Sequence, residues 1–286
     1  MTAIKRYHSA PACAAAAAML AMACTTAGTI SFSTGAPDGR IGTGSRPGSA
    51  GAIEIESADD FILGTGASIN HATFTGLLTG GATLSGINNV RVEIYRVFPK
   101  DSTVPPSGNV PTRVNSPSDV AFDERESASG TLSFPTSVLG GQFTVANTVL
   151  NGINKIPHQT TGGEGPATGT EVLFDVSFTT PFTLPPDHYF FVPQVGLDNG
   201  QFLWLSAPKP TNPPFAGDLQ SWIRNEDLAP DWLRIGTDVV GTQSPFNAAF
   251  SIDGATVPEP GSAGLLGAGL LLAGALRRRG RARRIP

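Results

Sequence analysis

The sequence contains only two cysteines in 286 residues, and both lie near its beginning, at Cys13 and Cys24. The long segment that follows has no disulfide, no thiol nucleophile and no thiolate that could bind a metal. Charged residues are also scarce, at 15% of the composition, and no apolar pattern of helical period appears between residues 30 and 255. These absences exclude a disulfide-stapled scaffold, cysteine-based catalysis and a mainly helical fold.

Glycine and proline are abundant instead, with 34 and 24 residues, and they separate short segments of strand-like sequence. The clearest segment, residues 89–98, places Val90, Val92 and Ile94 on one face and Arg91, Glu93 and Tyr95 on the other. Further candidate strands lie at residues 29–34, 52–56, 61–63, 72–78, 142–150, 171–178, 188–195, 201–205 and 246–252. This pattern predicts an all-β fold, with residues 28–255 forming a single antiparallel β-sandwich that is jelly-roll-like or immunoglobulin-like.

The connections between these segments carry two further expectations. Asp198, Asn199 and Gly200 separate two candidate strands and predict a hairpin turn. Residues 99–120 and 207–231 form two long connections, and loops of this length in a compact domain are usually functional or disordered. The second contains too many large apolar residues to be disordered.

The charge of the chain is unevenly distributed. Between Gly28 and Val257 there are 22 acidic and 11 basic residues, whereas six arginines lie beyond residue 276. An acidic body without a basic stripe is not expected to bind nucleic acid.

The first 27 residues predict a secretory signal peptide. Lys5 and Arg6 precede an alanine-rich apolar stretch at residues 12–23, and small residues suited to a cleavage site follow it. The alternative is an alanine-rich helix within the fold, and lipidation of Cys24 is left open. The signal peptide predicts export with the help of the secretion machinery and removal by signal peptidase.

The end of the chain predicts a membrane segment. Residues 261–276 are all Gly, Ala, Leu or Ser, and as a helix they would be about 24 Å long, which is short for a bilayer core of about 30 Å. Arginines beside an apolar segment stay on the cytoplasmic side, so the body is expected outside the inner membrane. The leucines of the segment and the first arginines after it are Leu265, Leu266, Leu270, Leu271, Leu272, Arg277, Arg278 and Arg279.

The triplet Pro258-Glu259-Pro260 stands just before this apolar segment and its arginines. The order of the three parts, within residues 256–286, resembles a PEP-CTERM sorting signal. The resemblance implies an exported protein of a Gram-negative bacterium that makes extracellular polysaccharide, and recognition by exosortase, a membrane protease-transpeptidase that removes the tail near the triplet. The protein would then be a membrane-anchored intermediate first, and a cell-surface or extracellular protein afterwards. The alternatives are a proline linker before a permanent single-pass anchor and a buried core helix.

No catalytic constellation is evident in the body, and no cofactor or metal is expected. His71, His158 and His188 lack metal-ligand spacing, and no G-x-S-x-G or phosphate-binding glycine motif occurs. Carboxylate pairs at residues 59–60 and 123–126 are the remaining route to catalysis, although solvated loop charges are the commoner explanation. We therefore expect a non-enzymatic protein.

Trp222 and Trp232 flank the end of the second long connection, and with Arg224 beside them they form a candidate ligand site, because sugar rings stack on flat aromatic faces beside polar groups. The alternative is that the indole rings fill one end of the sandwich. Two functions follow from these observations. The first is a non-catalytic surface or matrix protein associated with exopolysaccharide. The second is a carbohydrate-binding module or glycoside-active enzyme that uses these tryptophans and nearby carboxylates.

Overall fold

The structure, a computed structural model, describes residues 27–49, 51–103, 105–154, 156, 159–209, 220–241 and 247–257. Residues 1–26 of the expected signal peptide, His158, and the segment from Pro258 onward with its triplet, leucines and arginines lie outside this part. No helix within the described ranges has the length and apolar character needed to cross a membrane.

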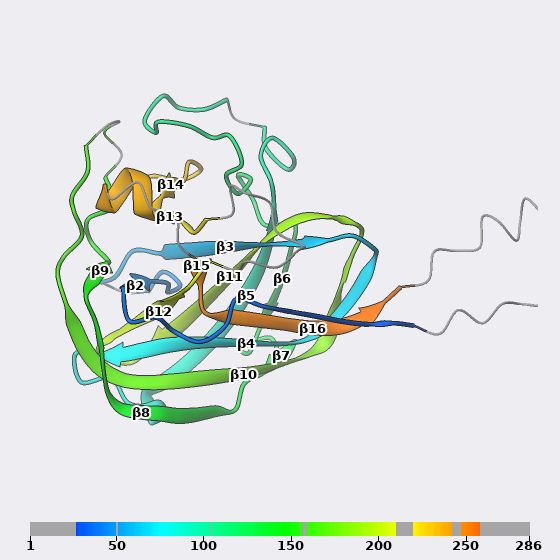
Figure 1. The fold of residues 1–286 in the computed structure, drawn as a ribbon, viewed down its shortest axis with the longest axis horizontal. Coiled ribbons are helices and arrows are strands. Elements are labelled where there is room, and N and C mark those ends of the chain that lie inside the picture. Colours follow the sequence, from blue (N-terminus) through cyan, green and yellow to red (C-terminus); the bar gives the residue numbers. More distant parts are fainter. Residues whose placement is uncertain are drawn as a thin grey trace, which may run out of the picture.

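The described chain is all-β and contains two sheets (Figure 1). The ten-stranded sheet consists of β1 (Thr29–Ser33), β2 (Ile41–Gly44), β4 (Ala67–Thr79), β7 (Leu132–Ser133), β8 (Thr136–Val145), β9 (Asn147–Val149), β10 (Ala167–Leu184), β12 (Gln201–Ala207), β15 (Asn247–Ala248) and β16 (Phe250–Thr256). The six-stranded sheet, in the order β14-β13-β3-β11-β5-β6, consists of β3 (Ile55–Leu63), β5 (Ile87–Arg96), β6 (Asp123–Glu126), β11 (Asp187–Leu197), β13 (Trp222–Asn225) and β14 (Leu233–Arg234). Every pairing is antiparallel except that of β2 with β9, which is parallel.

The two sheets enclose an aromatic core. Phe191 of the six-stranded sheet stacks on Phe250 of the ten-stranded sheet, with ring centroids 5.1 Å apart, and Phe74 stacks on Phe174 at 4.6 Å. Along β10 buried and exposed residues alternate from Val172 to Phe178, as expected for a strand with one face toward a core. The expected all-β class is confirmed, and two sheets around one core agree with a β-sandwich.

The outer face of the six-stranded sheet, the one turned away from this core, is covered as well. Along β11, residues 189–195 are all buried, because the described part of residues 99–120 and the segment between β13 and β14 lie over the sheet (Figure 1). In the candidate strand at residues 52–56, Ile55 and Glu56 are therefore both buried, whereas Ile53 is 41% exposed. This outer layer contains most of the buried charged groups.

Two local expectations are corrected. The turn at Asp198–Gly200 exists, and Gly200 adopts a φ of 80°, but β11 and β12 belong to different sheets. The turn therefore crosses between the sheets and does not close a hairpin. Two short helical turns also occur where none was expected: a 3-10 turn, η1 (Leu84–Gly86), and a π-helix, η2 (Ile235–Val240).

The strands define two ends of the molecule. Thr29 of β1 pairs with Ala255 of β16, and Thr256 pairs with Ala67, the first residue of β4. We call this end the terminal pole. Because β4 has 13 residues, its other end lies roughly 40 Å away along the strand. There Thr79 pairs with Gln201, and we call this end the pocket pole.

Candidate functional site

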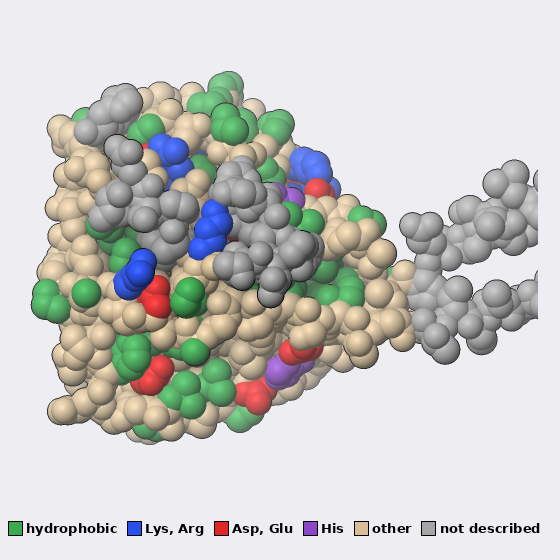
Figure 2. Space-filling view, viewed as in Figure 1, with side chains coloured by type: hydrophobic (Ala, Val, Ile, Leu, Met, Phe, Trp, Pro, Cys, Tyr) green, Lys and Arg blue, Asp and Glu red, His purple; other side chains and the backbone are tan. Residues whose placement is uncertain are grey.

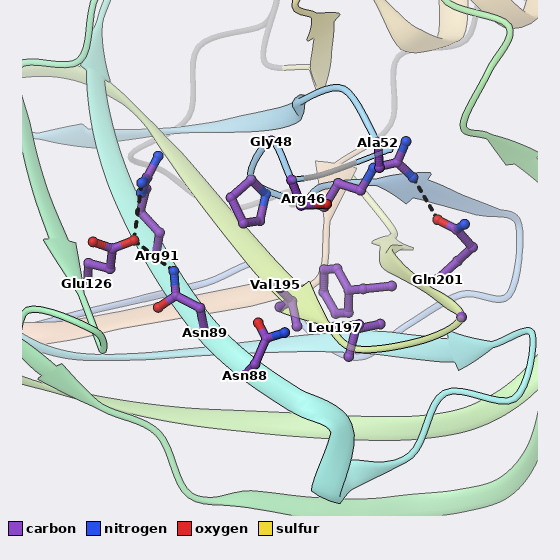
Figure 3. Close-up of a pocket in the computed structure, with 15 residues that line it drawn as sticks. Arg46, Gly48, Ala52, Asn88, Asn89, Arg91, Glu126, Val195, Leu197 and Gln201 are labelled. Atoms are coloured by element: carbon purple, nitrogen blue, oxygen red, sulfur yellow. Dashed lines mark hydrogen bonds and ion pairs between the residues drawn. The ribbon is translucent and has the colours of Figure 1, made fainter.

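A pocket of about 350 Å³ opens at the pocket pole (Figure 3). Its walls come from residues 46–49 and Ala52 between β2 and β3, the first half of β5, Glu126 of β6, the end of β11 and the start of β12. A volume of this size lies within the range of small-ligand sites in proteins. Of the residues that line the pocket, Glu126 of β6 is the one that stood among the sequence candidates, within the carboxylate group at residues 123–126.

Two turns give the pocket its shape. The segment after β2 doubles back through paired hydrogen bonds between Ser49 and Ala52, and Gly51 between them has a φ of 94°. On the other side, Gly200 approaches the backbone of Thr79 so closely that a Cβ atom would collide with the Thr79 carbonyl oxygen. Glycine is required there both for its positive φ and for this close approach.

On one wall of the pocket the cation, Arg91, is paired with carboxylates. The Arg91 guanidinium donates to Glu126 Oε1 over 3.1 Å and lies 3.7 Å from Glu54 Oε1. Asn89 Nδ2 donates to the same Glu126 oxygen over 2.7 Å, as the dashed lines in Figure 3 show. Burial lowers the pKa of Arg91, but the charges of Glu93 and Glu126 outweigh it and raise the pKa overall. The buried Nε of Arg91 nevertheless has no hydrogen-bond partner.

The opposite wall carries a cation without a carboxylate. Arg46 Nη1 donates to Gln201 Oε1 over 2.7 Å, and Arg46 Nε donates to the carbonyl oxygen of Ile53 over 3.2 Å. Both acceptors are neutral, and within the described ranges Arg46 forms no ion pair. Burial accordingly lowers the pKa of Arg46, because partial loss of water disfavours its charged form.

The residues selected from the sequence as a ligand site lie elsewhere and are buried. Trp222 and Trp232 are 1% and 0% exposed, and both pack into the outer layer above the six-stranded sheet with Tyr95 and Phe190. Arg224 is buried with them and pairs with Glu56. These side chains present no open aromatic face to a ligand, because the first long connection covers them: Trp232 Nε1 donates to the Ser118 carbonyl oxygen over 3.1 Å.

The outer layer is a network of buried ion pairs. Arg224 donates to Glu56 and to the Tyr95 hydroxyl, which itself donates to Glu56 Oε1 over 2.7 Å. Arg113, from the first long connection, binds both Asp119 and Asp231, at 2.9 and 2.6 Å. These contacts fasten β13 to β3, and the first long connection to the turn that follows β13. The second long connection contains a strand that was not expected, β13, and its residues 210–219 lie outside the described part of the chain.

Glu93 lies within this network and has an altered acidity. Burial, followed by the nearby charge of Glu56, raises its pKa from an ordinary value of about 4.5 to about 8. The folded state therefore holds a proton on Glu93 over a range of pH in which the unfolded chain has released it. The free energy of unfolding should fall as the pH rises from about 5 to about 8, and the loss should be complete above the folded pKa.

Replacing Glu93 by glutamine removes the titrating group and nearly keeps its shape. We expect Glu93→Gln to flatten the decline in unfolding free energy between pH 5 and pH 8, as measured by chemical denaturation at several pH values. Glu226→Gln, at an exposed turn, should leave the decline unchanged. An equal slope in wild type and Glu93→Gln would show that another group causes the decline.

The remaining sequence candidates do not converge on a catalytic arrangement. Asp59 and Asp60 are adjacent on β3 and point to opposite faces. Asp59 accepts from Asn247 Nδ2 and the Ala248 amide, whereas Asp60 contacts His188 Nε2 at 2.7 Å. Burial and the charge of Asp60 raise the pKa of Asp59. Within residues 123–126, Asp123 pairs with Arg125 at 2.6 Å, and Glu126 takes part in the pocket wall.

His71 lies on the outside of the ten-stranded sheet between two acids. Its Nε2 is 2.8 Å from Asp175 Oδ1 and its Nδ1 is 3.2 Å from Asp253 Oδ2. The carboxylates flank the ring on opposite sides and so do not converge on one point. Across the described ranges, no group of histidines and acids has the geometry of a metal site.

Comparison with known proteins adds no assignment to these observations. No model of a protein family matches the chain, and no curated protein gives a significant match.

Proposed function

We propose that the chain is an exported, exosortase-processed protein of the cell surface or extracellular matrix, whose non-catalytic sandwich associates with exopolysaccharide. The observation that carries the proposal is the order of Pro258-Glu259-Pro260, the apolar residues 261–276 and the terminal arginines. A signal peptide at the other end fits the same route. A jelly-roll-like or immunoglobulin-like topology for the sandwich is part of the proposal.

The positions of the two chain ends support this interpretation. The amide of Thr256 donates to the carbonyl oxygen of Gly28 over 2.7 Å, and the amide of Val257 donates to Gly66 over 2.8 Å. Both flanking segments of the sequence thus join the body at the terminal pole. A body tethered there exposes the pocket pole away from the membrane, where a polysaccharide can reach it.

The face shown in Figure 2 fits a non-nucleic-acid partner. Its lysine and arginine side chains are separate from one another, and acidic side chains lie among them. No continuous basic stripe crosses the described part of this face. An electrostatic footprint for a phosphate backbone would need such a stripe.

A carbohydrate-binding module or glycoside-active enzyme is the second candidate. Its original basis, an open site at Trp222, Arg224 and Trp232, has lost its support because these side chains are buried. The pocket that Arg46 and Gln201 line supports the binding-module form of this candidate. An ordinary single-pass membrane protein is the third, and it differs only in whether the tail is retained.

The intact mass of the protein recovered from the native cell surface or culture medium tests the proposal. We expect a mass that lacks the signal peptide and everything after about Pro260. A variant in which Pro258, Glu259 and Pro260 are all alanine should retain residues 261–286. If the wild-type protein also retains them, the tail is a permanent anchor and the exosortase assignment is wrong.

A further inference from the structure

The Arg46 wall of the pocket lacks a counter-charge. Its guanidinium is partly withdrawn from water, donates only to the neutral oxygens of Gln201 and Ile53, and forms no ion pair within the described ranges. Withdrawing a cation from water without a counter-charge costs free energy, and a bound anion would offset that cost. The Arg46 wall therefore offers a place for an anionic group.

Further unused hydrogen-bonding groups line the same pocket. In the described part of the chain neither Asn88 Oδ1 nor Gln201 Nε2 takes part in a hydrogen bond. In Figure 3 Asn88 comes from β5 and Gln201 from the start of β12. They combine donors with an acceptor, which is the set that sugar hydroxyls, as both donors and acceptors, can satisfy.

We infer that the pocket binds an acidic sugar unit of a polysaccharide, with Arg46 as the partner of its carboxylate. A guanidinium can hold a carboxylate through two parallel hydrogen bonds, while the amides of Asn88 and Gln201 take the ring hydroxyls. The overall negative charge of the body repels polyanions in general, so binding depends on this local cation. The choice of a sugar over another carboxylate rests on the proposed association with polysaccharide.

Three probes separate the possible sources of affinity. Trigalacturonic acid, its fully methyl-esterified form and glutarate are titrated into the purified full-length chain in detergent by calorimetry. The first carries carboxylates on sugar rings, the second has the same rings without charge, and the third has carboxylates without rings. We expect binding of trigalacturonic acid that is at least about tenfold tighter than that of either other probe.

Two variants address Arg46 directly. Arg46→Gln should weaken trigalacturonic acid binding by at least about tenfold, the expected size for one charge-assisted contact. Gln201→Glu places a carboxylate on the acceptor that Arg46 already contacts, so it should remove binding while keeping that contact. Arg40→Gln is the matched control, because Arg40 is an arginine with a 75% exposed side chain outside the pocket, and its affinity should stay within about twofold of the wild type.

Each other outcome overturns a defined part of the inference. Equal binding of the methyl ester removes the role of charge and leaves a neutral-saccharide pocket. Equal binding of glutarate removes the role of the sugar. Unchanged affinity in Arg46→Gln and Gln201→Glu places the ligand elsewhere. Failure of all three probes overturns the pocket assignment, whereas the sorting part of the proposed function is decided separately by the intact mass of the native protein.

Discussion

Replacing Trp232 by alanine is expected to lower the free energy of unfolding by about 3–5 kcal/mol. The Trp232 side chain is fully buried. It packs edge-on against Tyr95 with ring centroids 5.5 Å apart, and the Arg224 guanidinium lies 4.4 Å from its ring centre. Its removal would leave a cavity that the surrounding ion pairs cannot close, because they are held in place by several hydrogen bonds. Equilibrium denaturation of the full-length chain in detergent measures the loss.

Two comparisons show whether Trp232 acts by filling the outer layer. Trp232→Phe keeps most of the ring but loses the bond to the Ser118 carbonyl, so it should cost less than the alanine variant. Val120 lies in the first long connection, like Ser118, and is 59% exposed. Val120→Ala should change the free energy of unfolding by less than about 0.5 kcal/mol. A Trp232→Ala protein of wild-type stability that had lost ligand binding would restore the original idea of an aromatic ligand site.

Replacing Arg224 by methionine should have an effect of similar size. Methionine keeps much of the apolar stem, but it leaves the buried Glu56 without its ion-pair partner and next to Glu93. Removing one partner of a buried ion pair typically costs about 3–5 kcal/mol, because the other charge stays buried and uncompensated. Thermal and chemical denaturation should both register this loss.

The double variant Arg224→Met, Glu56→Gln tests that cause. It removes both charges, and we expect it to recover at least half of the stability that Arg224→Met loses. Lys100→Met is the control at a more exposed ion pair. Lys100 pairs with Asp187 at 2.6 Å but keeps half of its side chain exposed, so its loss should cost about 1 kcal/mol or less. No recovery in the double variant would mean that Arg224 stabilises by packing alone.

The fold class was predictable because the core obeys a local rule. In β10 and in the Val90, Val92, Ile94 face of β5, every second residue faces the aromatic core, and that period of two is visible in the sequence. The polar face of β5 was predictable too, but its burial was not. This face is covered by long connections that have no regular spacing of apolar residues. Their position over the sheet therefore leaves no pattern in the sequence.

The candidate site was beyond sequence analysis for a related reason. Arg46 and Gln201 are 155 positions apart, and Arg224 and Glu56 are 168 apart, so their partnerships exist only after the sheets form. The tryptophans were predicted to bind a ligand because large aromatic residues occur both in ligand sites and in cores, and the sequence does not distinguish these two environments. The Asp198–Gly200 signal was correct about the turn and wrong about the hairpin, because β11 and β12 lie in different sheets.

The pairing of β16 also determines how the molecule would carry a load. Suppose that the chain is held at its C-terminal end and that a polymer bound at the pocket pole exerts a force on it. The fold is then stretched parallel to its long strands. β16 is hydrogen-bonded to β4 along one edge and to β1 along the other. A force along β16 would therefore act on both rows of hydrogen bonds in shear, so that many must break together, whereas a force across the sheet would open them one at a time. An attachment through the C-terminal end of β16 and a ligand in the pocket would therefore load the fold along its long strands.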